Sequence, residues 1–280
     1  MRSVVLESKW VESSAEQMYL WAVTGWAASA RDYAFAENKE VNPFFLDFEQ
    51  PWVVRAQKIK LNLPRVVHEK FRGMSQFTVT PSITHVGRTS LSMDHEFRFK
   101  EEGDPLNGAV FAKVQAVIVC TNEFGESMPF PFDERARKKE NWDKSIENWD
   151  DISPPENKPE NLNDLLFQHN VMVRPCDIDG MEHLHSANYI FYVWDAFYFS
   201  FKDKVPFILQ THVKDMFVEF LNPLFPGENL CISVWAPNKN DISLPTVTCY
   251  ELIRISDGVV AAKAKMTVDF TEAMRSNGSL

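Results

Sequence analysis

The stretch VMVRPCDIDGMEHLHSANYIFYVWDAFYFSF, residues 171–201, decides the fold of this chain. It opens as an alternating apolar segment, breaks at Pro175, and then gathers five ionisable side chains within nine residues: Asp177, Asp179, Glu182, His183 and His185. Ser186 and Asn188 are residue types that favour helix N-caps, and nearly every residue from Tyr189 onward is apolar. A helix that is apolar all round must be buried on all sides. With only about four turns it is too short to span a membrane, so we expect the rest of the chain to surround it.

Strand-like segments follow this helix, and a similar series precedes it. After the helix at 186–201, alternating apolar patterns predict strands at 212–221, 229–236, 243–255 and 259–270. A further strand is predicted at 167–174, before the segment 177–185 with its five ionisable side chains, here called the ionisable loop. The first half predicts a strand at 4–10, a capping box at 13–16, a helix at 17–33, and strands at 52–63, 74–80, 89–99 and 109–120. Each half is therefore predicted to contain one strand, one buried helix and four more strands.

The two halves also match each other at a nearly constant offset. The hairpin NGAVFAK at 107–113 matches DGVVAAK at 257–263. Four further pairs occur in the same order: Glu96-Phe97 with Glu251-Leu252, Ser90 with Ser243, Gly73 with Gly227, and Pro64 with Pro223. We interpret this as a tandem duplication. It predicts a first unit at 1–132 with a degenerate site, a charged, Pro-containing linker at 133–165, and a second unit at 166–275.

Composition and charge exclude several classes of protein. The net charge of -10, from 29 basic and 39 acidic residues, argues against nucleic-acid binding, which requires clustered Lys and Arg. No segment is long and apolar enough to span a membrane, and we see no secretory signal. The four cysteines have no CxxC spacing and lie in or beside apolar segments, which favours reduced thiols and a cytoplasmic protein.

One long hydrophobic helix wrapped by a curved antiparallel sheet resembles the hotdog fold, and two copies resemble a double hotdog. The DxDGMxHxHxxNY motif of the second copy, with Asp177, Asp179, His183, His185 and Tyr189, is similar to the DxDxNxHxNNxxY stretch of plant and bacterial acyl-carrier-protein thioesterases. Its DxD and NY elements also resemble the hydroxybenzoyl-CoA thioesterase family. Met181 and His185 stand where the first motif has Asn. The resemblance implies an α+β tandem hotdog of the thioesterase superfamily.

The residues themselves offer the groups that thioester hydrolysis needs. Asp179 is the expected catalytic carboxylate, either as general base on water or as nucleophile, and His183 is expected to orient the carbonyl oxygen or the water. The N–H groups at the start of the Ser186 helix are expected to bind the developing oxyanion. We expect His185, Asn188 and Tyr189 to contact the substrate.

Simpler interpretations remain for some of these residues. Asp177 and Asp179 can both be turn formers that make Asx hydrogen bonds ahead of the helix. The two histidines and the repeat favour a catalytic role for Asp179, and Asp177 is interpreted as a turn former. His185 can be a local hydrogen-bonding residue. Asp179, His183 and His185 together have the chemistry of a metal site, but we expect neither a metal nor a cofactor.

Three functions fit this pattern. The leading one is a thioesterase that hydrolyses an acyl-CoA or acyl-carrier-protein thioester to the free acid, as fatty acid metabolism requires. The second is a hotdog dehydratase or hydratase acting on a hydroxyacyl or enoyl thioester, and the third is a non-catalytic acyl-binding protein. The expected partner is the acyl thioester, with no nucleic acid and no membrane span, and two double hotdogs can associate as a homodimer.

Overall fold

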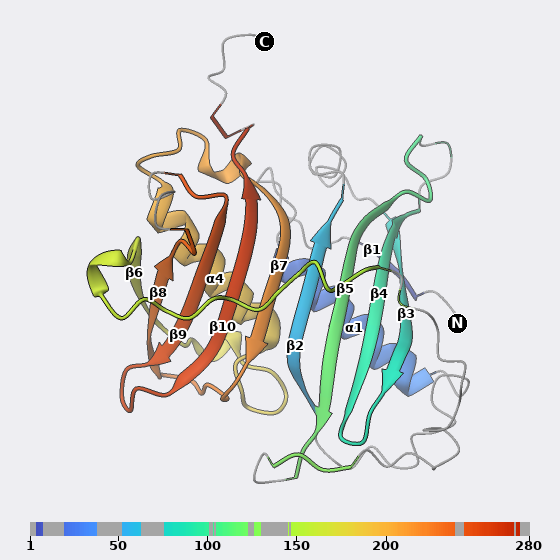
Figure 1. Ribbon diagram of the computed structural model, residues 1–280. Coiled ribbons are helices and arrows are strands. Elements are labelled where there is room, and N and C mark those ends of the chain that lie inside the picture. Colours follow the sequence, from blue (N-terminus) through green and yellow to red (C-terminus); the bar gives the residue numbers. More distant parts are fainter. Residues whose placement is uncertain are drawn as a thin grey trace. The chain divides into compact units, whose positions relative to one another are not determined.

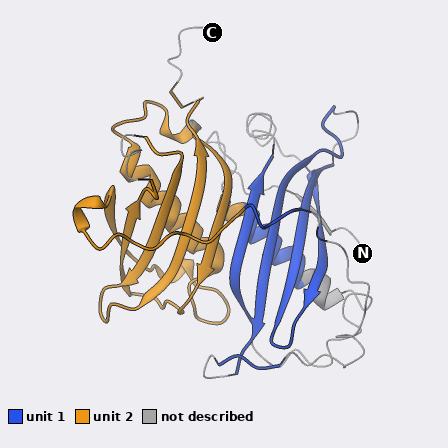
Figure 2. Ribbon diagram, viewed as in Figure 1, with its two compact units in different colours: residues 1–12, 23–151 blue, residues 13–22, 152–280 orange. Residues whose placement is uncertain are grey.

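The computed structural model describes residues 4–7, 20–37, 52–62, 76–100, 103, 105–122, 126–129, 145, 147–238, 244–271 and 273–274. The chain divides into two compact units, shown in Figure 2: unit 1 comprises residues 1–12 and 23–151, and unit 2 comprises residues 13–22 and 152–280. The predicted capping box at 13–16 lies outside the described residues, as do Pro64, Gly73 and Ser243 of the internal repeat.

Unit 1 contains an antiparallel sheet and most of one helix. Its elements are β1 (Val4–Glu7), α1 (Leu20–Glu37), β2 (Trp52–Leu61), β3 (Gln76–Val86), β4 (Ser90–Phe99) and β5 (Val110–Cys120). The strands lie in the order β1-β3-β4-β5-β2. The ring of Trp26 in α1 packs on that of Phe77 in β3, with centroids 4.6 Å apart. The helix therefore covers one face of this sheet (Figure 1).

Unit 2 has the same succession of elements. They are β6 (Phe167–Met172), α4 (Ser186–Phe201), β7 (His212–Phe220), β8 (Asn229–Trp235), β9 (Val247–Arg254) and β10 (Val260–Asp269), with short 3-10 turns at Leu162–Asp164, Pro175–Asp177 and Ile208–Gln210. The strands lie in the order β6-β8-β9-β10-β7, all antiparallel. In both units the order is first, third, fourth, fifth and second, with the helix after the first strand.

The repeated hairpins have equivalent backbone conformations. Gly108, between β4 and β5, has a φ of 80°, and Gly258, between β9 and β10, has a φ of 72°. Side chains other than glycine rarely adopt this region. The NG and DG steps of the repeat therefore serve the same structural purpose in the two units.

The strand predicted at 74–80 is longer in the structure, because β3 continues through Pro81 to Val86. β1 pairs only with Gln76–Val79, and beyond that point the one described neighbour of β3 is β4. Proline lacks the N–H that a central strand needs, but it is tolerated where one side of a strand is unpaired. The predicted strand was therefore ended too early at this proline.

Helix α4 begins and ends at the predicted residues, 186 and 201. Its buried side chains include Tyr189, Ile190, Tyr192, Val193 and Phe197. α4 packs against β6 and β8 on one face of the unit 2 sheet (Figure 1). Among the described residues, no helix has both the length and the apolarity needed to cross a membrane.

An extended segment at 147–161, here called the strap, lies against the sheets. In unit 1, the indole N–H of Trp149, a residue only 5% exposed, donates to Asp94 Oδ2 at 3.1 Å. In unit 2, Lys158 pairs with Glu251 at 3.3 Å and Lys265 donates to Ser153 at 2.9 Å. Figure 1 shows the strap and α4 on opposite faces of the unit 2 sheet. The strap is thus an ordered layer of each unit.

Candidate active site

The ionisable loop closes on itself before α4 begins. Ile178 and Leu184 form an antiparallel bridge, and the Asp179 N–H donates to the His183 carbonyl at 2.8 Å. Glu182 completes the turn with a φ of 63°, a left-handed conformation that is uncommon for a residue with a side chain. The result is a tight loop with Asp179 and His183 at its base.

Asp179 is half-buried and uses one carboxylate oxygen within the loop. Its Oδ1 accepts hydrogen bonds from the N–H groups of Met181 at 2.8 Å and His183 at 3.4 Å. Its Oδ2 has no hydrogen-bond partner in the part of the chain that the structure describes. The backbone therefore fixes the carboxylate through one oxygen and leaves the other available.

Asp177 has a different role from the one the sequence suggested. It is 4% exposed, and its two oxygens accept from Arg174 Nε at 2.8 Å and Nη2 at 2.9 Å. The Tyr192 hydroxyl also donates to Asp177 Oδ2. The Asx turn predicted for Asp177 is formed by Asp179 instead, so that interpretation was wrong for Asp177.

The charges around Asp177 favour its ionised form. Burial raises the pKa of this carboxyl, but hydrogen bonds from Arg174 and Tyr192 and the nearby guanidinium charge outweigh burial and hold its pKa below the usual value. Burial and the same carboxylate raise the pKa of Tyr192. Asp177 is therefore a buried anion that joins the loop to α4.

His183 lies against the turn between β7 and β8. Its ring meets Phe225 edge to face, with centroids 5.5 Å apart. Its ring nitrogens have no hydrogen-bond partner within the described ranges. The backbone around it is anchored, since the Leu184 N–H donates to the Leu224 carbonyl at 2.8 Å. His183 is thus held by packing, with its polar atoms uncommitted to the fold.

The three predicted substrate contacts also take part in the local structure. His185 is the N-cap of α4, where its Nδ1 accepts from the Ala187 N–H at 3.2 Å. Asn188 Nδ2 donates to the Asp177 carbonyl at 2.8 Å, and the Tyr189 hydroxyl donates to the Asn222 carbonyl at 3.2 Å. Their contact with a substrate stays a prediction.

The start of α4 retains a backbone donor. The His185 ring occupies the Ala187 N–H, and the Asn188 N–H donates to the His185 carbonyl at 2.8 Å. The Ser186 N–H, at the first helical position, has no intrahelical acceptor, and none is found among the described residues. One open N–H therefore remains where the helix carries partial positive charge.

The loop does not form the metal site that its residue types allow. Asp179, His183 and His185 do not converge as a metal site, and the described residues contain no group of three His, Cys, Asp or Glu side chains that does.

Arg174 and Tyr192 were not identified from the sequence as part of the site. Arg174 lies three residues before Asp177, a spacing that within this 3-10 turn brings the two side chains together.

Solved structures with the same architecture cover nearly the whole chain. A 12:0-ACP thioesterase from Umbellularia californica has a TM-score of 0.68 at 12% identity, over 95% of this chain and 97% of that one. An acyl-ACP thioesterase from Bacteroides thetaiotaomicron has a TM-score of 0.64 at 12% identity, over 95% and 98%. A MaoC-like dehydratase from Phytophthora capsici has a TM-score of 0.50 at 11% identity, over 80% and 71%.

Sequence comparison adds no relative to these structures: no family model and no curated protein matches the chain. At about 12% identity, structural similarity establishes the fold and leaves the reaction open. The antiparallel sheets and the few helices agree with that fold. The chain thus has the fold of the hotdog superfamily.

Proposed function

We propose that this protein is a thioesterase that hydrolyses an acyl-CoA or acyl-carrier-protein thioester to a free carboxylic acid. The observation that carries the proposal is the state of Asp179: Oδ1 is held by two backbone N–H groups, and Oδ2 has no partner among the described residues. A general base or nucleophile needs this combination of a fixed position and an uncommitted oxygen.

The proposed mechanism assigns one step to each nearby group. Asp179 Oδ2 accepts a proton from a water molecule as the water oxygen attacks the thioester carbonyl carbon. The carbonyl oxygen becomes an oxyanion, which the Ser186 N–H and the positive end of α4 stabilise. The carbon–sulfur bond then breaks, and the thiolate leaves without needing a strong general acid. His183 orients the attacking water or the carbonyl oxygen.

We extend the proposal to the architecture. Each unit is a hotdog, with its sheet curved around one hydrophobic helix, and the chain is a tandem pair in which unit 2 carries the site. The repeated strand order and the equivalent Gly108 and Gly258 hairpins support this. His185, Asn188 and Tyr189 then act at the site by keeping the loop and the start of α4 in position, and by lining the path of the substrate.

A hotdog dehydratase or hydratase is the second candidate. Asp179 and His183 are a carboxylate and an imidazole on one short loop, and proton transfer at the alpha carbon of an enoyl or hydroxyacyl thioester uses such a pair. Such an enzyme would act on the same class of substrate as the proposed thioesterase, an acyl thioester, but would break a different bond. The third candidate, a non-catalytic acyl-binding protein, would bind the same class of molecule and catalyse no reaction.

Two assays on the full chain distinguish these three functions. We expect thiol release from saturated acyl-CoAs of graded chain length, followed with a thiol-reactive dye. With an enoyl-CoA, any loss of enoyl absorbance should be matched by an equal release of thiol. Loss of enoyl absorbance without thiol release would instead identify a hydratase. Saturable binding of a non-hydrolysable acyl thioether analogue, with neither reaction, would identify an acyl-binding protein.

A further inference from the structure

The turn between β7 and β8, residues 221–228, lies against the ionisable loop. The Leu184 N–H of the loop donates to the Leu224 carbonyl of the turn at 2.8 Å. The next residue of the turn, Phe225, brings its ring edge to face with the His183 imidazole, with centroids 5.5 Å apart. The turn therefore contacts the proposed site through a side chain that carries no polar group.

Core packing does not explain an aromatic residue at position 225. The Phe225 side chain is 41% exposed, whereas the neighbouring Leu224 is fully buried and anchors the turn in the core. The His183 ring nitrogens have no hydrogen-bond partner in the described part of the chain, and Phe225 is the one aromatic ring there that meets the imidazole. An edge-to-face contact is favourable and directional. The orientation of the His183 ring therefore depends on Phe225.

Glu228 fixes the backbone from which the Phe225 ring projects. Its Oε2 accepts from the Phe225 N–H at 2.8 Å, and its own N–H donates to the Phe225 carbonyl at 3.2 Å. Its Oε1 accepts from Arg254 Nη1 at 3.2 Å, and Arg254 also binds Asp257 through Nε and Nη2. A chain of charged groups thus connects the hairpin between β9 and β10 to Phe225.

The backbone holds the same turn from the side of β6. The Gly227 N–H donates to the Val173 carbonyl at 2.8 Å, and the Val173 N–H donates to the Glu228 carbonyl at 2.9 Å. Gly227 has a φ of 83°, a conformation that a residue with a Cβ rarely adopts. Phe225 is therefore presented on a well-anchored turn, as a residue that orients another side chain requires.

We propose that Phe225 is a positioning residue for His183, and that Glu228, held by Arg254, acts through Phe225. The ring contact restricts the imidazole to the orientation in which it acts on the attacking water or the carbonyl oxygen. This inference rests on the proposed thioesterase function for the role of His183. The restriction of the ring is a property of the folded chain and can be measured without substrate.

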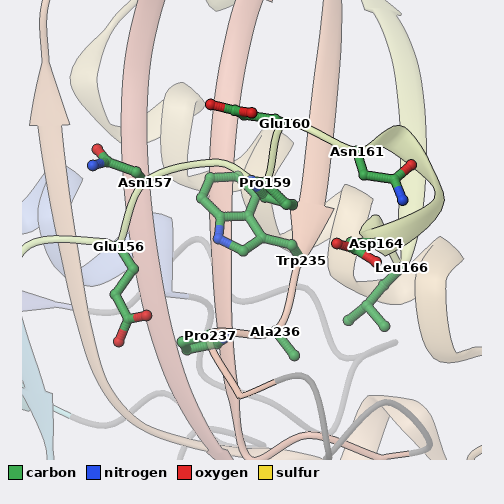
Figure 3. Close-up of a pocket in the computed structure, with 10 residues that line it drawn as sticks. All are labelled: Glu156, Asn157, Pro159, Glu160, Asn161, Asp164, Leu166, Trp235, Ala236 and Pro237. Atoms are coloured by element: carbon green, nitrogen blue, oxygen red, sulfur yellow. The ribbon is translucent and has the colours of Figure 1, made fainter.

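The pocket in Figure 3 is a separate feature of unit 2 and supplies a control residue. It has a volume of about 430 Å³ and lies beside the strap at the Trp235 end of β8, whereas the turn precedes the Asn229 end of that strand. Its described lining contains no residue of the turn or of the ionisable loop. Glu160, an exposed residue of the lining, therefore has the same charge as Glu228 at a distant place.

The first test measures the motion of the His183 ring in the full chain, by NMR relaxation of its Cε1–Hε1 group, with the signal assigned by its loss in His183→Gln. Phe225→Leu keeps an apolar side chain and removes the ring. We expect the order parameter of this group to fall from the rigid range, about 0.85, towards the flexible range, below about 0.6.

Phe199→Leu is the matched control for this measurement. Phe199 stacks on a different histidine of unit 2, His169, with centroids 4.9 Å apart. Its replacement should leave the His183 order parameter unchanged. An unchanged order parameter in Phe225→Leu, or an equal fall in the two variants, would overturn the proposal.

The second test measures thiol release from an acyl-CoA. We expect Phe225→Leu to lower kcat about 3- to 10-fold with little change in KM. Phe225→Tyr keeps the ring and should retain the parental kcat, as should Phe199→Leu. Parental kcat in Phe225→Leu would overturn the proposal. If the parent chain releases no thiol, the proposed thioesterase function fails, while the order parameters still decide whether Phe225 positions His183.

The third test asks whether Glu228 acts through Phe225. Glu228→Ala removes both acceptor oxygens and should lower kcat and the His183 order parameter as Phe225→Leu does, whereas Glu160→Ala should change neither. The double variant Phe225→Leu/Glu228→Ala should be no worse than Phe225→Leu alone, because the two residues act as one unit. Additive losses, or equal effects of Glu228→Ala and Glu160→Ala, would overturn the role of Glu228.

Glu228→Gln keeps this last test decisive if Glu228→Ala fails to fold. Its amide oxygen can accept from the Phe225 N–H, but the pairing with the Arg254 charge is lost. We expect an intermediate loss of kcat and of the order parameter in the parent background, and no further loss in the Phe225→Leu background. Parental values for Glu228→Gln, or the same loss in both backgrounds, would contradict the role of Glu228.

Discussion

The Tyr192 hydroxyl, on the second turn of α4, donates a hydrogen bond to the buried carboxylate of Asp177, which ends the 3-10 turn at the start of the ionisable loop. Arg174 binds the same carboxylate through two nitrogens. Asp177 also receives the His185 N–H and the Asn188 side chain at its backbone carbonyl. One residue thus joins β6, the loop and the helix, and it sets the position from which Asp179 projects.

Replacing Asp177 by Asn should lower the free energy of unfolding by about 1–3 kcal/mol at pH 7, because the buried carboxylate that pairs with the exposed Arg174 side chain loses its charge. The folded pKa of Asp177 is below its ordinary value, so the stabilisation is complete above about pH 4 and is lost as the pH falls through the folded pKa. Urea unfolding of parent and variant between about pH 3 and pH 7 measures both effects. If the free energies of unfolding of parent and variant, plotted against pH, stay parallel down to pH 3, this account of Asp177 is contradicted. Asp203→Asn, at an exposed residue, is the matched control.

Tyr192→Phe removes one donor to Asp177 and keeps the packing of the ring. We expect the free energy of unfolding to fall by about 1 kcal/mol. The loss of stability at low pH should also extend to higher pH, because one cause of the lowered Asp177 pKa is gone. Tyr198→Phe, a half-buried tyrosine of the same helix, should change stability by less than about 0.5 kcal/mol. Similar losses in the two variants would mean that the hydroxyl of Tyr192 has no special role.

Gly258→Ala should destabilise unit 2 by about 1–2 kcal/mol, because the φ of 72° is unfavourable for a residue with a Cβ. Space is not the cause, since a Cβ at Gly258 would meet no atom within 4 Å. Gly180→Ala is the control, because Gly180 has equally open surroundings without a positive φ. Thermal unfolding of the two variants checks the difference, and an equal Tm would contradict the backbone argument.

Asp94→Asn tests whether the strap is a stable layer of unit 1. Asp94 is fully buried and accepts hydrogen bonds from Gln115 at 3.1 Å, Ser145 at 2.6 Å and Trp149 at 3.1 Å. An amide cannot accept on both sides, so the variant should lose about 1–3 kcal/mol and expose Trp149 to a fluorescence quencher. Asp150→Asn, on the exposed part of the strap, should have neither effect. Unchanged quenching in Asp94→Asn would show that the strap does not depend on Asp94.

The elements of the second half could be predicted from the sequence because local and tertiary preferences agree there. The apolar run from Tyr189 to Phe201 predicts the observed helix to the residue, and the strands after it differ from prediction by a few residues at most, as at 247–254. β3 shows the limit: proline is a strong local signal for the end of a strand, but whether a strand is paired on one side or two is decided by the whole sheet.

The site was predicted less completely, for a physical reason. The sequence identifies an acidic and histidine-rich loop before a helix, but it does not say which aspartate is buried. Arg174 and Tyr192 decide this, since they supply the donors that make burial of Asp177 favourable. The helix N-cap is His185, and the residues predicted from cap preferences, starting with Ser186, lie inside the helix. These outcomes depend on contacts between elements that sequence spacing alone does not specify.

The most direct test of the account is the rate of thiol release from an acyl-CoA by the parent chain and by Asp179→Asn. Asn keeps an oxygen that can accept from the Met181 N–H, so the loop should persist while the base is lost. We expect kcat to fall by about 10²- to 10⁴-fold, with unchanged thermal stability and with full activity in Asp203→Asn. Turnover by Asp179→Asn at the parental rate would contradict the account.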